Sequence, residues 1–474
     1  MTLPAKFVER VLRDLGGTEG AALCAALDAE PPVSVRLNPA KTGAETVSAG
    51  PDAGLPVPEA AGLPALASAG RVPWSRDGRY LAVRPSFTLD PDFHAGAYYV
   101  QEASSQFVGH LLAAVRTEGA RILDLCAAPG GKTTLYASLA GPDGLVVANE
   151  IDRRRASVLA DNVRKWGTGN VAVTTCEPRA LGDFEAWFDV VAVDAPCSGE
   201  GMFRKDPDAR GEWSEGNVKQ CAARQDEILR EAWRALRPGG TLVYSTCTFN
   251  RDEDEGALER MAAWAGDEIA ESEETAVEDA WGIVCGRVGA FRTFRFYPHR
   301  TCGEGFFAAV ARKSFDAGGR VRAPKARRTV FAAVDRKTAG ELARWVRNPG
   351  GMRFAAVADT CYAWYAAQAD AVRTLSEALP VIYSGVALGQ VFKGVLKPDP
   401  ALAFFDGLNR GALPAAELDD EETLRFLRRQ DIAAGGLAEG MNLVCSRGRA
   451  LGFAKRIGAR VNNLYPNSLR IIKQ

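Results

Sequence analysis

The sequence predicts an α/β fold, with a doubly wound parallel sheet between a small α+β N-terminal domain and a β-rich C-terminal one. The first observation behind this prediction is the length of the chain. With 474 residues it is too long to fold around one hydrophobic core of ordinary size, and it corresponds to about three domains. The second is an alternation, from residue 121 onward, of short β-branched apolar runs with helical stretches. Such alternation is typical of a parallel sheet covered by helices on both faces.

Five apolar runs are predicted to form the parallel strands: 121–125, 145–150, 171–176, 188–195 and 240–247. Helices are expected between them at 132–140, 153–166 and 218–236. The last helix should stop at Arg237-Pro238-Gly239-Gly240, where proline and glycine favour a helix end. Two later strands, 291–297 and 305–312, would complete the sheet. We expect the acidic stretch 267–279 to be a solvated helix or loop.

The flanking segments have a different character. Residues 1–95 combine a short amphipathic helix (7–15), an extended segment (33–37) and a Gly/Pro/Ala-rich stretch from Gly50 to Gly70. The core follows at 96–315. A connecting segment, 316–375, opens with the basic linker 318–328, which is either simply solvated or in contact with RNA. The last domain, 376–474, has β-rich segments near 381–396 and 440–471.

Composition and charge exclude several classes of protein. The 58 Lys and Arg residues balance 59 Asp and Glu, so any nucleic-acid surface must be local. The first twenty residues lack the apolar core of a signal peptide, and no stretch is long and apolar enough to span a bilayer, which indicates a cytoplasmic protein. The 10 cysteines form no C-x-x-C pair, so neither structural metal nor a disulfide framework is expected.

A strand, a glycine turn and a helix follow one another in LDLCAAPGGKTT, residues 123–134. A phosphate-binding P-loop would need a glycine where this chain has Cys126, and the turn also lacks the G-x-G-x-x-G of nicotinamide-binding folds. It nevertheless lets a ligand approach the backbone closely. The candidate cofactor contacts here are Cys126, Ala127, Ala128, Pro129, Gly130, Gly131 and Lys132.

Glu150 ends the second strand, about twenty residues after the glycine turn. An acid at this place can accept hydrogen bonds from both ribose hydroxyls of a nucleoside-containing cofactor, which suits S-adenosylmethionine. The alternative is an acid that merely faces the dipole of the next helix.

Reactive side chains end the fourth and fifth strands. Asp194 and Cys197 follow the fourth, and Cys247 follows the fifth. Because ligands bind at the carboxyl edge of an open parallel sheet, these residues should converge with Asp124 and Glu150 on one crevice. Either cysteine alone would be interpreted as a buried thiol. Both at one edge beside an acid indicate a catalytic site.

This set of residue types suits methylation of carbon 5 of cytosine. That carbon is a weak nucleophile until a thiolate adds at carbon 6 and turns it into an enamine carbon. Asp194 near ring nitrogen 3 would assist the addition as charge builds there. After methyl transfer, a base must remove the proton on carbon 5, and Cys197 or a water could assist. Spacing alone leaves open which of Cys197 and Cys247 attacks.

At these residues the sequence resembles the RNA cytosine-5 methyltransferases of the Sun/Nop/RsmF type. The resemblance covers nearly the whole chain, and GMFRKDP and VNNLYP look most like the bacterial RsmF-like ribosomal RNA branch. The motifs that carry it are GAYYVQE (96–102), LDLCAAPGGKTT (123–134), DAPCSGEGMFRKDP (194–207), Gln225, YSTCTFNRDEDE (244–255), Pro298-His299, Gly303-Glu304-Gly305 and VNNLYP (461–466).

The resemblance implies a class I methyltransferase core that uses S-adenosylmethionine. It implies Cys247 as nucleophile, Cys197 for product release, and Lys132 and Asp194 in the active site, with Asp194 also near the cofactor. Glu177 is the match for the acid that contacts the adenine. Residues 1–95 would be an RNA-binding domain and 376–474 a PUA-like β-barrel, both holding RNA while a base is splayed into the crevice.

The function expected from this resemblance is cytosine-5 methylation of RNA, specifically small-subunit ribosomal RNA, by a monomer without metal. One alternative is the same chemistry on transfer RNA. A second is a catalytically silent RNA-binding ribosome-assembly factor, against which two reactive thiols beside Asp194 argue. A DNA methyltransferase ranks third, because the PUA-like segment weighs against it.

Overall fold

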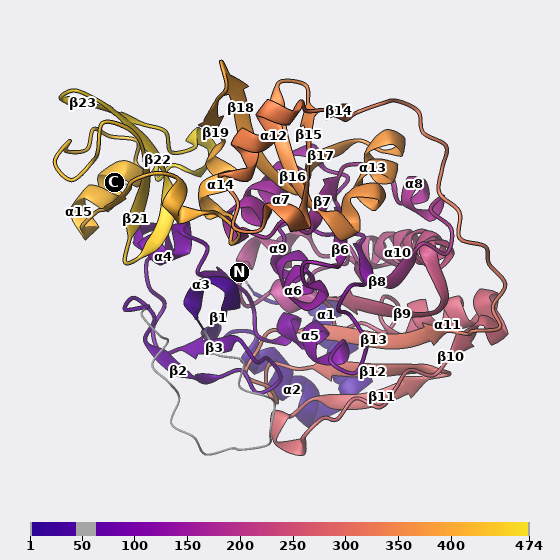
Figure 1. The fold of residues 1–474 in the computed structure, drawn as a ribbon. Coiled ribbons are helices and arrows are strands. Elements are labelled where there is room, and N and C mark those ends of the chain that lie inside the picture. The colour runs from indigo at the N-terminus through magenta and orange to yellow at the C-terminus, as the bar shows by residue number, and fades with distance from the viewer. Residues whose placement is uncertain (1, 44–62, 473–474) are drawn as a thin grey trace.

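The computed structural model describes residues 2–43 and 63–472. Its centre is a 10-stranded sheet with the order β11-β12-β13-β9-β8-β5-β6-β7-β17, in which β10 also pairs with β13 (Figure 1). The five predicted parallel strands are confirmed, and neighbours among them pair in parallel. They are β5 (Arg121–Asp124), β6 (Leu145–Asn149), β7 (Val171–Thr174), β8 (Phe188–Asp194) and β9 (Leu236–Thr246).

The predicted helices cover this sheet as α6 (Gly131–Ala140), α7 (Arg153–Trp166) and α10 (Glu215–Ala235). Helix α10 begins earlier than the apolar pattern indicated, because the Ser214 side chain accepts a hydrogen bond from the Asn217 backbone N–H and caps the helix. Strand β9 also begins earlier than expected, directly after α10, and includes the segment that ends the helix.

The sheet continues past β9 with antiparallel strands. Two of them, β12 (Phe291–Phe296) and β13 (Phe306–Lys313), confirm the predicted later strands, and β13 pairs with β9. The edge is formed by β11 (Val284–Val288). The acidic stretch after α11 (Glu255–Ala265) contains the short strand β10 (Ile269–Ala270), so part of it pairs with the sheet instead of being solvated.

Apolar side chains fill both faces of the central sheet. Along β5, Leu123 packs into the cluster on one face and Ile122 into the cluster on the other, and both are fully buried. Alternation of this kind is expected of a strand buried on both sides.

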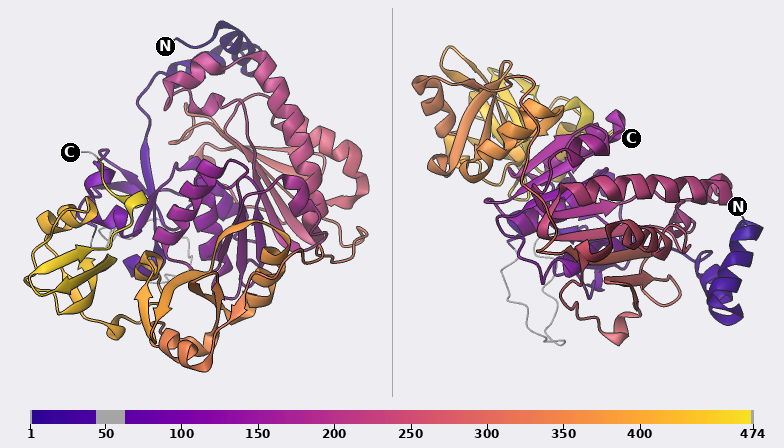
Figure 2. Two further views of the ribbon diagram at one scale, coloured as in Figure 1. Left: turned by 90° about the horizontal axis from the view of Figure 1, so that it is seen from above. Right: turned by 90° about the vertical axis from the view of Figure 1, so that its right-hand side faces the viewer.

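The N-terminal segment is divided into two parts. Helices α1 (Ala5–Leu15) and α2 (Gly17–Ala26) pack on loops of the core at the end of the molecule opposite the terminal sheet (Figure 2). A separate four-stranded sheet, β2-β3-β1-β4, is formed by β1 (Val33–Leu37), β2 (Ser68–Arg71), β3 (Gly78–Leu81) and β4 (Tyr98–Val100). Most of the predicted Gly/Pro/Ala-rich stretch from Gly50 lies outside the described residues.

Two small sheets follow the core. The first has the order β14-β15-β16-β18-β19 and the second β20-β21-β22-β23. Their strands are β14 (Ala332–Ala333), β15 (Met352–Val357), β16 (Thr360–Tyr365), β18 (Val386–Phe392), β19 (Val395–Pro398), β20 (Ala415–Glu417), β21 (Gly440–Ser446), β22 (Arg449–Ile457) and β23 (Arg460–Asn463).

The segment near residue 381 packs differently from the expectation that it belongs to the terminal domain. Strand β17 (Val381–Ser384) pairs antiparallel with β7 and extends the central sheet. The division of the chain at 95, 315 and 375 stays a prediction. Across residues 2–43 and 63–472, no helix is both long and apolar enough to cross a membrane.

Candidate active site

The glycine turn after β5 is shaped by backbone conformation and close packing. Gly130 has a φ of 111°, which favours glycine, and a Cβ there would lie 3.0 Å from Cδ1 of Leu159. The carbonyl of Pro129 accepts hydrogen bonds from Asn162 Nδ2 at 2.9 Å and from the Tyr99 hydroxyl at 3.1 Å. The turn is therefore held from α7 and from β4 while α6 begins directly after it.

Asp124 ends β5 beneath this turn and is 1% exposed. Its Oδ2 accepts a hydrogen bond of 2.6 Å from the Thr133 hydroxyl, and its Oδ1 has no partner among the described residues. Burial raises the pKa of this carboxyl to about 7. An unpaired buried acceptor at the carboxyl edge of the sheet calls for a donor from a ligand, and the ammonium of S-adenosylmethionine is such a donor.

Glu150 directly follows β6 and is 3% exposed. Its Oε1 accepts from the Asp152 backbone N–H at 3.0 Å, and its Oε2 pairs with Arg155 Nη1 at 3.2 Å. Arg155 also donates to the carbonyl of Ala128 at 3.0 Å, which ties Glu150 to the glycine turn. Two oxygens with spare lone pairs suit the two hydroxyls of a ribose.

Asn149, the polar residue directly before Glu150, is not among the site residues predicted from the sequence. Asn149 is 1% exposed and donates to the carbonyls of Leu125 and Cys176 at 3.3 and 3.0 Å. It also accepts from the Thr174 hydroxyl at 2.9 Å and so ties together the ends of three neighbouring strands. The sequence feature that indicates this role is an amide side chain at the end of an apolar run.

Two other predicted cofactor contacts differ in their surroundings. Cys126 is partly buried, and burial raises the pKa of its thiol well above the ordinary range. Glu177 is exposed before α8 (Pro178–Gly182), where its side chain makes no capping hydrogen bond.

Lys132 and Asp194 form a close ion pair, with 2.8 Å between Nζ and Oδ2. Burial lowers the pKa of Lys132, but the adjacent Asp194 carboxylate outweighs it, so the net pKa is raised. The other oxygen of Asp194 accepts from the Ser245 hydroxyl at 2.8 Å. Both oxygens of Asp194 are therefore oriented, and Lys132 keeps its charge beside them.

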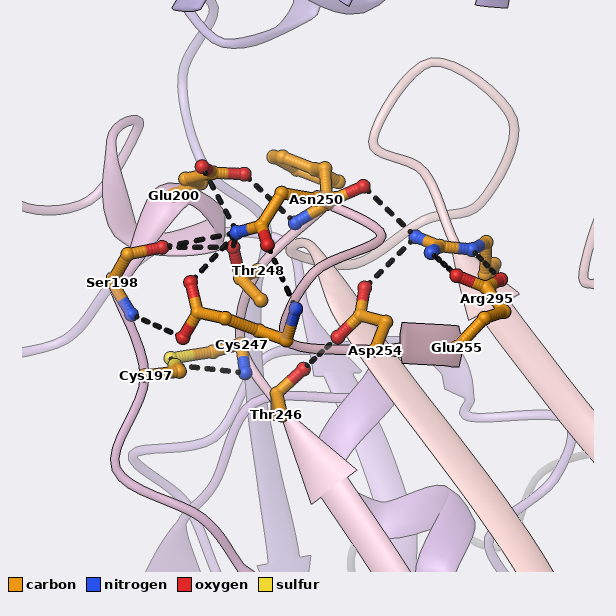
Figure 3. A network of polar contacts seen from close by, with 12 residues as sticks. Cys197, Ser198, Glu200, Thr246, Cys247, Thr248, Asn250, Asp254, Glu255 and Arg295 are labelled. Atoms are coloured by element: carbon orange, nitrogen blue, oxygen red, sulfur yellow. Dashed lines mark hydrogen bonds and ion pairs between the residues drawn. The ribbon is translucent and has the colours of Figure 1, made fainter. Parts of the chain in front are cut away.

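The two predicted cysteines lie in contact, with 3.1 Å between the Sγ atoms of Cys197 and Cys247 (Figure 3). The Cys247 backbone N–H also donates to Cys197 Sγ at 3.3 Å. The hydrogen bond with Cys247, together with burial, raises the pKa of the Cys197 thiol well above its usual value. Cys197 therefore retains its proton.

A buried polar network supports the loops that carry the cysteines. Glu253 accepts from the Ser198 backbone N–H at 2.9 Å, from Gln225 Nε2 at 2.9 Å and from Asn250 Nδ2 at 2.7 Å. Asn250 also donates to the Thr248 hydroxyl at 2.8 Å. Gln225 was expected by resemblance. Ser198, Thr248, Asn250 and Glu253 lie within the two motifs that carry the resemblance, although no role was predicted for them.

The five residues predicted to share one crevice lie along one edge of the sheet; they are Asp124, Glu150, Asp194, Cys197 and Cys247. Asp194, Lys132 and Glu150 all influence the pKa of Asp124, and the charge of Cys247 influences that of Lys132. Among the residues that the structure describes, His, Cys, Asp and Glu side chains form no group that could hold a metal ion.

This sheet order and an acid-lined glycine turn define a class I methyltransferase that uses S-adenosylmethionine. Family models agree with it along the chain. The model described as "16S rRNA methyltransferase RsmB/F" matches residues 111–312, and that of the N-terminal domain of 16S rRNA methyltransferase RsmF matches residues 3–103. The RsmF PUA domain matches residues 414–471.

Individual relatives agree with the family models. Ribosomal RNA small subunit methyltransferase F of Shewanella loihica is 32% identical over 418 residues, covering 84% of this chain and 83% of the relative. The protein of that name from Escherichia coli O127:H6 is 33% identical over 425 residues, covering 84% of each chain. The chain therefore belongs to the RsmF family of S-adenosylmethionine-dependent methyltransferases.

A solved structure shows the same fold. The crystal structure of NSun6 from Pyrococcus horikoshii with SFG has a TM-score of 0.51 and 23% identity, covering 65% of this chain and 98% of that one.

Proposed function

We propose that this protein methylates carbon 5 of a cytosine in small-subunit ribosomal RNA, in the cytoplasm, through a covalent adduct with Cys247. The observation that carries the proposal is the contact of 3.1 Å between the thiols of Cys197 and Cys247, next to the ion pair of Lys132 and Asp194. A thiolate nucleophile with a neighbouring thiol, a cation and an acid is the set that this reaction requires.

Addition comes first. The Cys247 thiolate forms a bond to carbon 6, and electron density moves through carbon 5 toward the carbonyl and nitrogen 3 of the ring. Lys132 brings a positive charge to the reacting sulfur, because Asp194 and the charge of Cys247 both raise the pKa of its ammonium. Asp194, oriented by Ser245 and Lys132, takes up a proton from solvent and passes it to nitrogen 3 during the addition. It takes the proton back when methyl transfer restores the double bond between carbon 4 and nitrogen 3. S-adenosylmethionine supplies the methyl group that carbon 5 then accepts.

Release completes the cycle. A water takes the proton from carbon 5, the electron pair re-forms the ring double bond, and the bond from carbon 6 to sulfur breaks. Cys197 still carries its proton and donates a hydrogen bond to the departing Cys247 thiolate. Without that donor the adduct should persist.

The experiment that tests the mechanism compares Cys247→Ala, Cys197→Ala and the control Cys221→Ala, which removes a buried thiol from α10. Cys247→Ala should abolish methylation and form no adduct. Cys197→Ala should accumulate protein bound to methylated RNA, visible as a band that survives denaturing electrophoresis. Cys221→Ala should retain activity. If the adduct accumulates only in Cys247→Ala, the two roles are exchanged. If neither variant loses activity, the covalent mechanism is wrong.

Ribosomal RNA is proposed as substrate because the family models and the relatives are those of small-subunit ribosomal RNA enzymes. Transfer RNA methylation and a silent assembly factor are the alternatives. Bisulfite sequencing of total RNA from cells with and without the protein separates all three. Loss of a 5-methylcytosine in small-subunit RNA supports the proposal, loss in transfer RNA changes the substrate, and an unchanged pattern contradicts enzymatic methylation at carbon 5.

A further inference from the structure

One buried carboxylate connects the loops of both cysteines (Figure 3). Glu200 is fully buried and follows Cys197 by three residues in the sequence. Its Oε2 accepts a hydrogen bond of 3.0 Å from the Phe249 backbone N–H, two residues after Cys247. Its Oε1 accepts from Asn250 Nδ2 at 3.2 Å. Glu200 therefore joins the two cysteine loops, as Glu253 does through Ser198 and Asn250.

The charge of Glu200 is balanced from outside the methyltransferase core. Arg10, on α1 of the N-terminal segment, forms a hydrogen-bonded ion pair with Glu200, and the exposed fractions of the two side chains are 14% and 0%. The Arg10 guanidinium also lies 5.2 Å from the ring centroid of Trp213, whose Nε1 donates to Glu200 at 2.9 Å. A buried carboxylate that loses its cation is left with a large desolvation cost.

Helix α1 is docked firmly enough to hold Arg10 in place. Phe7, one turn before Arg10, is fully buried, and its ring centroid lies 5.0 Å from that of Phe203 and 6.0 Å from that of Trp213. On α2, Glu19 pairs with Arg300 at 2.7 Å. The helical hairpin thus packs against the loop that follows Cys197 and against the segment after β12.

We propose that Arg10 is a positioning residue for Cys247 and Cys197, acting through Glu200, so that the N-terminal helical hairpin completes the active centre. The proposal rests on the proposed function only in taking Cys247 as the nucleophile. Arg10 touches neither sulfur. Its guanidinium is largely covered by Glu200 and Trp213, so its main role is to fix the loops rather than to contact RNA.

The test uses the full-length enzyme and the variants Arg10→Met, Glu200→Gln and the double variant. Arg10→Lys is the conservative replacement. Lys6→Ala is the control, because Lys6 lies on the same helix as Arg10 and makes an exposed ion pair with Glu215 on α10. Two readouts are taken on each variant: kcat and KM for RNA methylation, and the rate at which iodoacetamide alkylates Cys247, measured by mass spectrometry. Thermal unfolding shows which variants are folded.

Arg10→Met and Glu200→Gln should each lower kcat about 10- to 100-fold, the scale for a nucleophile displaced by about 1 Å, and change the alkylation rate of Cys247. KM for RNA should stay within about twofold. The double variant should be no slower than the slower single variant, because both changes act through one pair and no lone charge stays buried. Arg10→Lys should recover most of kcat, and Lys6→Ala should match wild type. The double variant also serves if Arg10→Met does not fold.

Two results would overturn the positioning role: a raised KM for RNA with intact kcat in Arg10→Met, or effects of the two single variants that multiply in the double variant. The same readouts separate this role from the proposed function. If alkylation of Cys247 changes as expected but Cys247→Ala still methylates RNA, the covalent mechanism fails and the positioning of the loop stands. If Cys247→Ala is inactive but Arg10→Met alters neither readout, the positioning role fails alone.

Discussion

Replacing Glu150 with glutamine should weaken S-adenosylmethionine binding by an amount that follows from its contacts. An ionised carboxylate has about four lone-pair sites. Two are used, by the Asp152 N–H at 3.0 Å and by Arg155 at 3.2 Å, which leaves two for the ribose hydroxyls. Glutamine keeps one oxygen and turns the other into a donor, so at least one charge-assisted hydrogen bond is lost. That costs about 1.5–3 kcal/mol, a rise in Kd of roughly 10- to 150-fold.

Calorimetric titration of the purified variant with S-adenosylhomocysteine measures this Kd directly. The matched control is Arg155→Met, which removes the ion pair and the hydrogen bond to the Ala128 carbonyl but leaves both oxygens of Glu150 as acceptors. The Arg155 side chain is 61% exposed, so this loss should cost less than about 1 kcal/mol. A Glu150→Gln protein that melts like wild type and binds with unchanged Kd would refute the assignment of Glu150 to the ribose.

Three further outcomes are expected. Burial raises the pKa of Asp124 to about 7, so the folded state binds this proton more tightly than the unfolded state; the resulting stability is present at low pH and is lost as pH rises from about 4 to about 7. Asp124→Asn should remove that part of the pH dependence of Tm in the cofactor-free protein, and an identical pH profile would contradict it. Arg295→Met leaves the fully buried Asp254 without its ion pair at 3.0 Å and should lower the free energy of unfolding in urea by about 3–5 kcal/mol; a change under about 1 kcal/mol would show that the pair is dispensable. Lys455→Ala with Arg460→Ala, both exposed on the terminal sheet, should weaken RNA binding and reduce the slope of log Kd against log salt by about 2, whereas an unchanged slope would place the phosphate contacts elsewhere.

The sheet and the edge that carries the reactive residues could be predicted because they depend on local pattern. Buried parallel strands are short apolar runs, and the residues that follow them, such as Asp194 and Cys247, meet at one edge. The support of that edge could not be predicted. Glu200 and Asn250 are polar residues within loops and resemble solvated positions in the sequence. Glu200 is buried where α1 packs on the core and pairs with Arg10 of that helix, and a contact between residues 10 and 200 leaves no periodic signal.

The same reasoning explains the misplacement of β17. A short apolar run near residue 381 is compatible with any sheet that has a free edge, and its sequence neighbours favoured the terminal domain. The structure instead pairs it with β7, where Tyr383 is buried among the residues of the central sheet. Which sheet a lone strand joins depends on the edge available, a property that a local sequence pattern does not contain.

Strand β17 also affects when the central sheet can be completed during synthesis of the chain. The parallel strands β5 to β9 are complete by residue 246, but β7 keeps a free edge until residues 381–384 have been made. An unpaired edge invites association with other chains, so a nascent or truncated protein that ends near residue 375 carries a catalytic sheet with an open side. Genetic removal of the terminal segment therefore exposes an aggregation-prone edge in addition to removing the proposed RNA-binding surface, and studies of the last domain should begin their deletions beyond Ser384.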